Sequence, residues 1–180
     1  SNVFSGTGFN LANAGKQSVE GVEFDMNWYP INDLRVSFAA TYLDPKYDEF
    51  EGALGVDGPT DLSGETPAGI PELSTNTSVT YNFQAGSLAD GYVRVEHVYE
   101  DEVQVVDNVP KDIASREINM VNASLGLYFA NGWEMNLWGR NLNEDEYLQS
   151  AFPSVAQAGS YSGYPNTPRT YGLTVRYSFE

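Results

Sequence analysis

Apolar and polar residues alternate with a period of two through most of the chain. In the segment 22–28, the apolar positions are Val22, Phe24, Met26 and Trp28. The same alternation runs through six further segments, which are 34–42, 73–83, 92–99, 121–129, 133–140 and 170–179. A period of two is that of a β-strand with one apolar face. The pattern therefore predicts seven strands of about 9–11 residues, a length that crosses a bilayer when the strand is tilted.

The connections between these strands alternate between short and long. The short ones, at 30–33, 84–91 and 130–132, contain the Pro, Asn and Gly residues that favour tight turns. The long ones cover 44–72, 100–117 and 143–168. Barrels of the bacterial outer membrane sort their connections in this way, with short periplasmic turns and long extracellular loops. The sequence thus predicts an all-β fold, an antiparallel transmembrane β-barrel in the bacterial outer membrane.

Aromatic residues gather beside the short connections, where such a barrel meets the periplasmic interface of the membrane. Aromatic rings form girdles at membrane interfaces because their bodies are apolar while their polar tips reach water. Ordinary β-propensity is the alternative explanation, since Tyr and Trp are common in any strand. Loop length and aromatic position agree independently, so we favour the membrane. The expected girdle residues are Trp28, Tyr81, Phe83, Trp133, Tyr177 and Phe179.

The composition removes several classes of function. The 180 residues include 9 Lys and Arg against 25 Asp and Glu, so the formal net charge is −16. Such acidity argues against a nucleic-acid partner. The chain has no cysteine and one histidine, which excludes a disulfide framework, a thiolate zinc site, a cysteine nucleophile and a His-rich metal site. The remaining residues form no catalytic constellation, and we expect neither an enzyme nor a bound cofactor or metal.

Most of the negative charge lies in the three long loops, which hold 17 acidic and 3 basic residues. A solvated surface explains this charge, and attraction of a cationic ligand or of divalent ions is the alternative. Ligand contacts are expected in the same loops, because aromatic rings flanked by Gly and Ser suit stacking on sugars or other flat groups. The candidate ligand-binding residues, all expected to be exposed, are Tyr47, Phe50, Tyr161 and Tyr164. The polar residues expected to point into a barrel lumen are Arg35, Arg94, Glu134, Arg140 and Arg176.

A sheet of seven strands is expected to need further strands. Bacterial single-chain barrels have even strand counts, and each unpaired backbone group at an open edge costs several kcal/mol in lipid. We therefore expect the barrel to close with strands outside this sequence. The segment 1–17 is then the end of an extracellular loop, and 18–180 holds the barrel strands.

Four motifs occur in a suggestive order. The segment 132–147 reads GWEMNLWGRNLNEDEY and the segment 168–179 reads PRTYGLTVRYSF, while NAGK at 13–16 precedes GVE at 21–23 and PAGIP at 67–71 precedes a strand. The first resembles the penultimate strand of TonB-dependent receptors, and the second resembles their closing strand. The other two are similar to strand openings that recur in that family.

The resemblance implies a barrel of about 22 strands, with this chain as its last seven. It implies a receptor for a scarce nutrient, above all a ferric siderophore or other metal complex, with cobalamin or an oligosaccharide as alternatives. The partners that it implies are the remaining barrel strands, a plug domain, the TonB complex, outer-membrane lipid and an extracellular small-molecule ligand. A passive porin and a soluble β-sandwich binding module or adhesin remain the alternatives from other classes.

Overall fold

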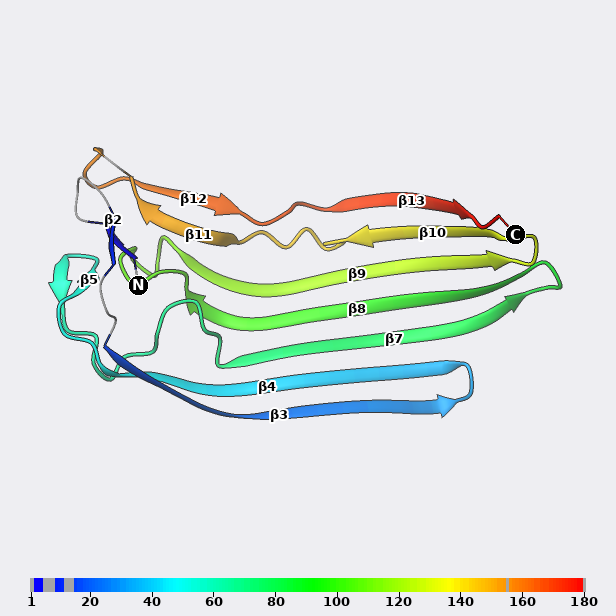
Figure 1. The fold of residues 1–180 in the computed structure, drawn as a ribbon, viewed down its shortest axis with the longest axis horizontal. Coiled ribbons are helices and arrows are strands. Elements are labelled where there is room, and N and C mark those ends of the chain that lie inside the picture. Colours follow the sequence, from blue (N-terminus) through cyan, green and yellow to red (C-terminus); the bar gives the residue numbers. More distant parts are fainter. Residues whose placement is uncertain (1, 5–8, 12–14, 155, 180) are drawn as a thin grey trace.

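A single antiparallel sheet of seven strands dominates the computed structural model, which describes residues 2–4, 9–11, 15–154 and 156–179 (Figure 1). The strands follow the order β13-β10-β9-β8-β7-β4-β3, so neighbours in the sheet also follow one another along the chain. The seven predicted strands are confirmed. Their bounds are β3 (Lys16–Ile31), β4 (Leu34–Glu49), β7 (Leu73–Ala85), β8 (Ala89–Gln104), β9 (Ser115–Phe129), β10 (Trp133–Arg140) and β13 (Thr170–Tyr177).

Several strands are longer than predicted, mainly at the end of the sheet that carries the long loops. Strands β3, β4 and β8 have 16 residues each and β9 has 15, so the expected length of 9–11 is wrong for them. Strand β4, for example, continues through Asp44, Pro45 and Lys46. These added residues do not alternate between apolar and polar, because they extend beyond the apolar band that the alternation marks.

Short hairpins lie inside the connections, and the sequence pattern did not predict them. The first long loop contains β5 (Ala53–Gly55) paired with β6 (Gly58–Thr60), and the third contains β11 (Leu148–Pro153) paired with β12 (Tyr161–Pro165). Near the N-terminus, β1 (Asn2–Phe4) pairs with β2 (Phe9–Leu11). The described residues contain no helix long and apolar enough to span a membrane.

The register of the sheet sorts the side chains onto two chemically different faces. One row crosses the sheet through directly paired residues and is apolar throughout, namely Leu34, Tyr81, Val93, Leu125, Leu137 and Leu173. The adjacent row, on the opposite face, consists of Arg35, Thr80, Arg94, Ser124, Trp138 and Gly172. A shift of one residue in any pairing would mix the two sets. The predicted alternation is therefore realised across all the strands together.

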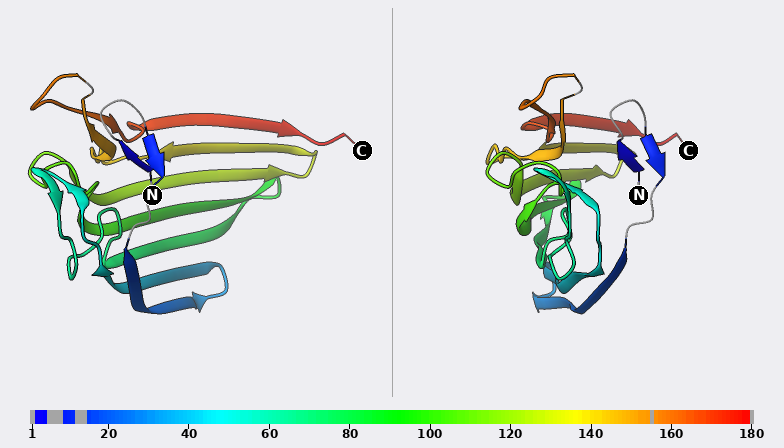
Figure 2. Two further views of the ribbon diagram at one scale, coloured as in Figure 1. Left: turned by 60° about the vertical axis from the view of Figure 1, so that its left-hand side comes forward. Right: turned by 90° about the vertical axis from the view of Figure 1, so that its left-hand side faces the viewer.

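The sheet is curved, and its two faces differ in how much solvent they meet. Seen along the strands, it forms an open arc (Figure 2). On the polar face Ser78 and Asn122 are 4% and 6% exposed, whereas Val22 and Leu173 on the apolar face are 69% and 57% exposed. Side chains converge on the inside of an arc, so the polar face is the concave one. An outer face this apolar requires an apolar surrounding, which a membrane supplies.

The six expected girdle residues lie at the short-turn end of the sheet, on or just beyond the apolar face. Trp133 is paired with Tyr177, with ring centroids 4.8 Å apart, and Phe179 meets Tyr177 edge-on at 4.8 Å. Tyr81 and Phe83 stack at 6.5 Å on β7. Five of the six residues thus form two contacting groups at this end of the sheet.

Glycines within the strands make room for aromatic rings from the neighbouring strand. A Cβ added at any of three of them would lie within 3.0 Å of a ring atom, and each ring belongs to the directly paired residue. The pairs are Phe83 with Gly91, Tyr92 with Gly126, and Trp138 with Gly172. An aromatic ring that covers a strand glycine replaces packing that the glycine cannot provide. These glycines therefore serve side-chain packing across the strands.

We expect arginine at Leu125 to cost the folded protein about 2–4 kcal/mol, because Leu125 lies mid-strand on the apolar face. Arginine at Ser124, its neighbour on the polar face, should cost much less. The free energy of unfolding of both variants of the full-length protein, measured in lipid vesicles by urea titration, tests this assignment. Equal costs at the two positions would contradict it.

Candidate functional site: the outer-loop cluster

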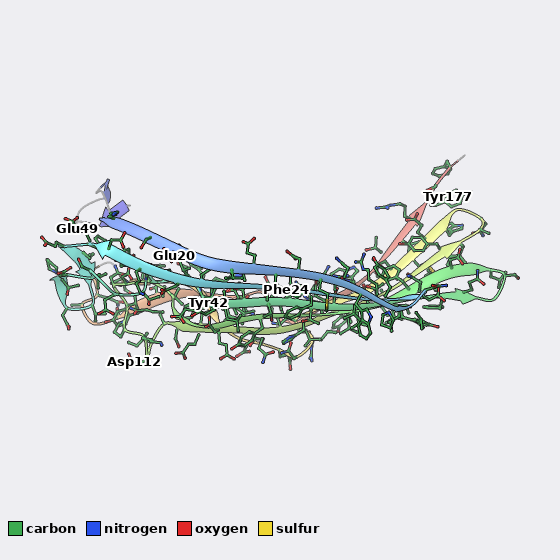
Figure 3. The ribbon with its side chains drawn as sticks, turned by 90° about the horizontal axis from the view of Figure 1, so that it is seen from below. Glu20, Phe24, Tyr42, Glu49, Asp112 and Tyr177 are labelled. Carbon is green, nitrogen blue, oxygen red and sulfur yellow. The ribbon has the colours of Figure 1, made fainter. Side chains whose placement is uncertain are left out.

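The three long connections lie together at one end of the sheet and form what we call the outer-loop cluster, residues 44–72, 100–117 and 143–168 (Figures 1 and 2). Glu49 and Asp112 lie at this end, while Tyr177 lies at the opposite end with the short turns (Figure 3). The loops contact one another through specific hydrogen bonds and a small apolar core. The cluster is therefore an ordered surface.

Tyr47 connects the first loop to the second. It is 8% exposed, so the expectation that its side chain is exposed is wrong. The chain folds back over it, since its backbone N–H donates to Glu65 O at 3.0 Å and its carbonyl accepts from Gly64 N at 2.6 Å. Its hydroxyl donates to Asp107 Oδ2 at 3.0 Å. Burial, with the Asp107 carboxylate adding to it, raises the pKa of Tyr47 to about 12, so the hydroxyl remains a donor at physiological pH.

Phe50 packs on Tyr47, with ring centroids 4.8 Å apart and planes tilted by 58°. It is only partly exposed, because its ring supports the buried tyrosine. Backbone contacts strengthen the same junction, since Gly69 N donates to Gln104 O at 2.8 Å. Tyr47 and Phe50 thus hold two loops together, a role that the sequence pattern did not reveal.

A small apolar core connects the second loop to the third. Val109 and Ala114 are fully buried and Ala151 on β11 is 4% exposed. Leu148 and Tyr161 of the β11–β12 hairpin pack against this core. Tyr161 is therefore half-buried instead of exposed as expected, because its ring completes the core between the loops.

The candidate ligand-binding residue Tyr164 is exposed as expected, with 63% of its surface accessible to solvent. It faces Phe152 across the hairpin, with ring centroids 5.9 Å apart, and Phe152 is 38% exposed. Ser150 and Ser162 are paired opposite these two rings. The hairpin thus presents an exposed aromatic pair bordered by hydroxyl groups. Phe152 was not predicted as part of this site.

The motif that follows β10 continues the sheet with side chains instead of backbone. The carboxamide of Asn143 donates to Asn119 O and accepts from Val121 N at 2.8 Å, as a peptide group in the next strand would do. Asp145 Oδ2 accepts from Asn119 N at 2.8 Å. These bonds satisfy the edge of β9 after the backbone of β10 has turned away. The polar residues of this motif therefore have a structural role, because they bind the backbone at the edge of β9.

Asn141 fastens the two ends of the third loop to each other. It is 2% exposed and has a φ of 51°. Its side chain accepts from Asp145 N at 2.7 Å and donates to Asp145 O at 2.8 Å and to Thr167 O at 3.3 Å. Asn166 also donates to Asp145 O, at 2.8 Å. We call Asn141, Asn143, Asp145 and Asn166 the asparagine clasp, since they fix where the β11–β12 hairpin leaves the sheet.

The clasp is connected to the polar face of the sheet. The backbone N–H of Asn141 donates to Asn122 Oδ1 at 3.0 Å, and Asn122 Nδ2 lies 3.4 Å from Glu96 Oε2. Arg94 Nη2 binds Glu96 Oε1 at 3.0 Å, and Arg140 Nη1 lies 3.9 Å from Glu96 Oε2. Two of the predicted lumen residues thus meet at one carboxylate, half-way along the concave face.

The other predicted lumen residues also lie in polar-face positions. Arg35 belongs to the polar row that contains Arg94. Arg176 is paired with Glu134 and their charged groups are 3.4 Å apart. Within the described ranges, no group of three or more His, Cys, Asp or Glu side chains is arranged to hold a metal ion.

A curved antiparallel sheet with an apolar convex face, a polar concave face and loops sorted by length is a segment of a transmembrane β-barrel of the bacterial outer membrane. A family model described as "TonB dependent receptor-like, beta-barrel" matches residues 1–142. The chain belongs to this family, whose members are transport receptors and not enzymes. A search of curated proteins finds no match.

Solved structures support the fold. The ferric yersiniabactin uptake receptor FyuA from Yersinia pestis is similar over 95% of this chain and 25% of its own, at 17% identity and a TM-score of 0.73. The siderophore receptor PiuA from Acinetobacter baumannii matches 89% of this chain and 22% of its own, at 18% identity and a TM-score of 0.66. BauA, the ferric preacinetobactin receptor from Acinetobacter baumannii, matches 95% of this chain and 23% of its own, at 16% identity and a TM-score of 0.68. This chain spans about a quarter of those chains or slightly less.

We expect Asn141→Gly to loosen the third loop while leaving the barrel folded. Glycine tolerates the positive φ, so the change removes only the side chain and leaves the Asp145 N–H without its partner, at a cost of about 1–3 kcal/mol. Limited proteolysis of the full-length receptor should cut 143–168 at least about tenfold faster, since local opening becomes more frequent. Gln149→Ala, which alters an exposed side chain in the same hairpin, is the control. Equal cleavage rates for the two variants would contradict the role of the asparagine clasp in holding the third loop.

Proposed function

We propose that the protein containing this chain is an active-uptake receptor for a ferric siderophore or a similar metal complex. The observation that carries the proposal is the outer-loop cluster, in which three loops join into one ordered surface that leaves the Phe152–Tyr164 pair exposed. Preorganised loops bind at a lower entropic cost than mobile ones. The family supports the same class of ligand, and so do the three similar structures, which are receptors for a siderophore or a ferric complex.

Strands β3 and β13 each have a single neighbour in the described sheet. We propose that further strands of the receptor pair with both edges, because unpaired backbone groups are costly in lipid. The concave polar face then lines a lumen that a plug domain fills, and TonB supplies the energy for import. Arg35, Arg94, Glu134, Arg140 and Arg176 are the polar-face residues that such a plug meets.

The charge of the cluster bears on which complexes can bind. Its loops carry 17 acidic and 3 basic residues, so an anionic complex that approaches them is repelled and a neutral or cationic complex is favoured. Tyr164 and Phe152 then supply a flat apolar contact. We therefore propose Tyr164 as a ligand contact, with Tyr47, Phe50 and Tyr161 acting through the scaffold that positions it.

Uptake of radioactive iron complexes by cells that express only this receptor tests the proposal. Tyr164→Ala should weaken binding of the imported complex by about tenfold, whereas Tyr171→Ala should not. Tyr171 is 78% exposed but lies on the apolar face at the same end of the sheet, so it is a matched control for loss of an exposed tyrosine.

Uptake that persists after the proton gradient is collapsed would identify a passive porin and contradict active transport. Uptake of cobalamin or an oligosaccharide, with no iron complex imported, would contradict the ligand class. Equal binding by the Tyr164 and Tyr171 variants would remove the aromatic pair from the ligand site.

A further inference from the structure

The apolar face of the sheet carries a polar pair in the half nearer the outer-loop cluster. Nε2 of His97 on β8 lies 2.8 Å from Oδ1 of Asn119 on β9. Residues 93–99 of β8 are paired with β9 without a shift of register, so His97 shares a face with Val93 and Val95. Both valines are exposed on the apolar face. The pair therefore points outward, away from the concave face.

The two halves of the apolar face differ in their chemistry. Nearer the short turns, the described strands place only apolar residues, glycine and the aromatic residues of the girdle on this face. Nearer the long loops, two successive rows contain polar side chains, with Thr77 and His97 in the first and Thr75, Tyr99 and Asn119 in the second. The apolar face is therefore asymmetric along the strands.

The position of the pair along the strands places it in the outer half of the membrane. His97 lies six residues and Tyr99 eight residues beyond Gly91, which is paired with the girdle residue Phe83. At a rise of about 3.3 Å per residue and a strand tilt of about 40°, they lie about 15 Å and 20 Å above that girdle. The apolar band of such a barrel is about 25 Å tall. The pair is therefore within the hydrocarbon, about 5–10 Å below its outer boundary.

Strand pairing leaves the side chain of Asn119 uncovered. β10 is paired with β9 only as far as Ala123, and beyond this point Asn143 and Asp145 bind the backbone of Asn119. Asn119 is exposed, and in the described part of the chain its Nδ2 and the Nδ1 of His97 have no hydrogen-bond partner. Such groups are costly in hydrocarbon without a partner. An ionisable residue at this depth marks a functional contact.

We propose that His97 and Asn119 bind the acyl region of a β-hydroxyacyl glycolipid in the outer leaflet. This leaflet of the bacterial outer membrane is built from acylated glucosamine lipids, whose chains carry a β-hydroxyl group and an amide or ester link close to the sugar. These groups lie just inside the hydrocarbon boundary, at the depth of the pair. Asn119 Nδ2 donates to them and the second nitrogen of His97 binds the hydroxyl, while the chains pack on the adjoining valines.

The surroundings of the pair favour the acyl hydroxyl over the headgroup phosphate. Glu117, two residues beyond Asn119 on β9, is an exposed acid, and its charge opposes direct contact with a phosphate. The phospholipids of the inner leaflet lack an acyl hydroxyl, which matches the absence of a similar pair from the other half of the described apolar face. The proposal does not depend on which complex the receptor imports.

Binding of two synthetic glycolipids by the detergent-solubilised full-length receptor tests the proposal. Both are diacylated glucosamine phosphates with chains of equal length, and only one carries β-hydroxyl groups. Native mass spectrometry should show the hydroxylated lipid bound about tenfold more tightly, as hydrogen bonds of ordinary strength provide. The double change His97→Leu and Asn119→Leu should abolish this preference. Tyr81→Phe, which removes a hydroxyl from the same face at the inner girdle, is the control and should keep it.

Three outcomes would overturn the proposal. The first is equal affinity of the unchanged receptor for the two glycolipids, and the second is a preference that the double variant retains. The third is a shift from dimer to monomer in the double variant with no change in glycolipid binding, which would assign this face to a second copy of the receptor.

Stability in lipid separates glycolipid binding from a structural role of the pair. In phosphatidylcholine vesicles, which contain no acyl hydroxyl, the double variant should unfold at the same urea concentration as the unchanged receptor or at a higher one. The reason is that both partners of the hydrogen bond are replaced by apolar groups on an apolar face. Adding the hydroxylated glycolipid should raise the urea midpoint of the unchanged receptor only. A lower midpoint for the double variant in phosphatidylcholine would show that the pair holds β8 to β9, and would overturn the proposal.

Discussion

The hydrogen-bonded ladder between neighbouring strands is the constraint on which the rest of this structure depends. In a hydrocarbon environment, backbone groups have no water to bind, so every strand must be paired along its length. Pairing with a side-chain period of two also fixes which face each residue occupies. The apolar row through Leu125 and the polar row through Ser124 follow from this one constraint. So does the curvature, which brings the polar side chains together on the concave face.

The same requirement explains the least regular part of the sheet. Where β10 leaves β9, the side chains of Asn143 and Asp145 take over the bonds that a backbone would make. Asn141 then ties both ends of the loop to this point. The exposed aromatic pair of the β11–β12 hairpin is therefore placed by hydrogen bonds that begin at the sheet. Its position is set relative to the membrane barrel as well as to the other loops.

Alternation and turn residues were sufficient to predict the seven strands and their two faces, because these are local consequences of period and turn chemistry. The burial of individual side chains in the loops was harder to predict. Tyr47 is flanked by Lys46 and Asp48, as an exposed residue would be, yet Asp107, sixty positions away, buries it. Tyr161 and Tyr164 look equivalent in sequence, but only Tyr161 meets the core around Val109. Such differences arise from contacts between distant loops, which no local pattern records.

The sorting of residues onto two faces is the central claim, and it can be measured directly along β9. The segment contains no cysteine, so single cysteines at positions 121 to 128 of the receptor in lipid vesicles can each carry a nitroxide spin label. Collision with oxygen, which is concentrated in lipid, should be high at 121, 123, 125 and 127 and low at the even positions between them. Uniform accessibility, or a maximum at the even positions, would contradict the account.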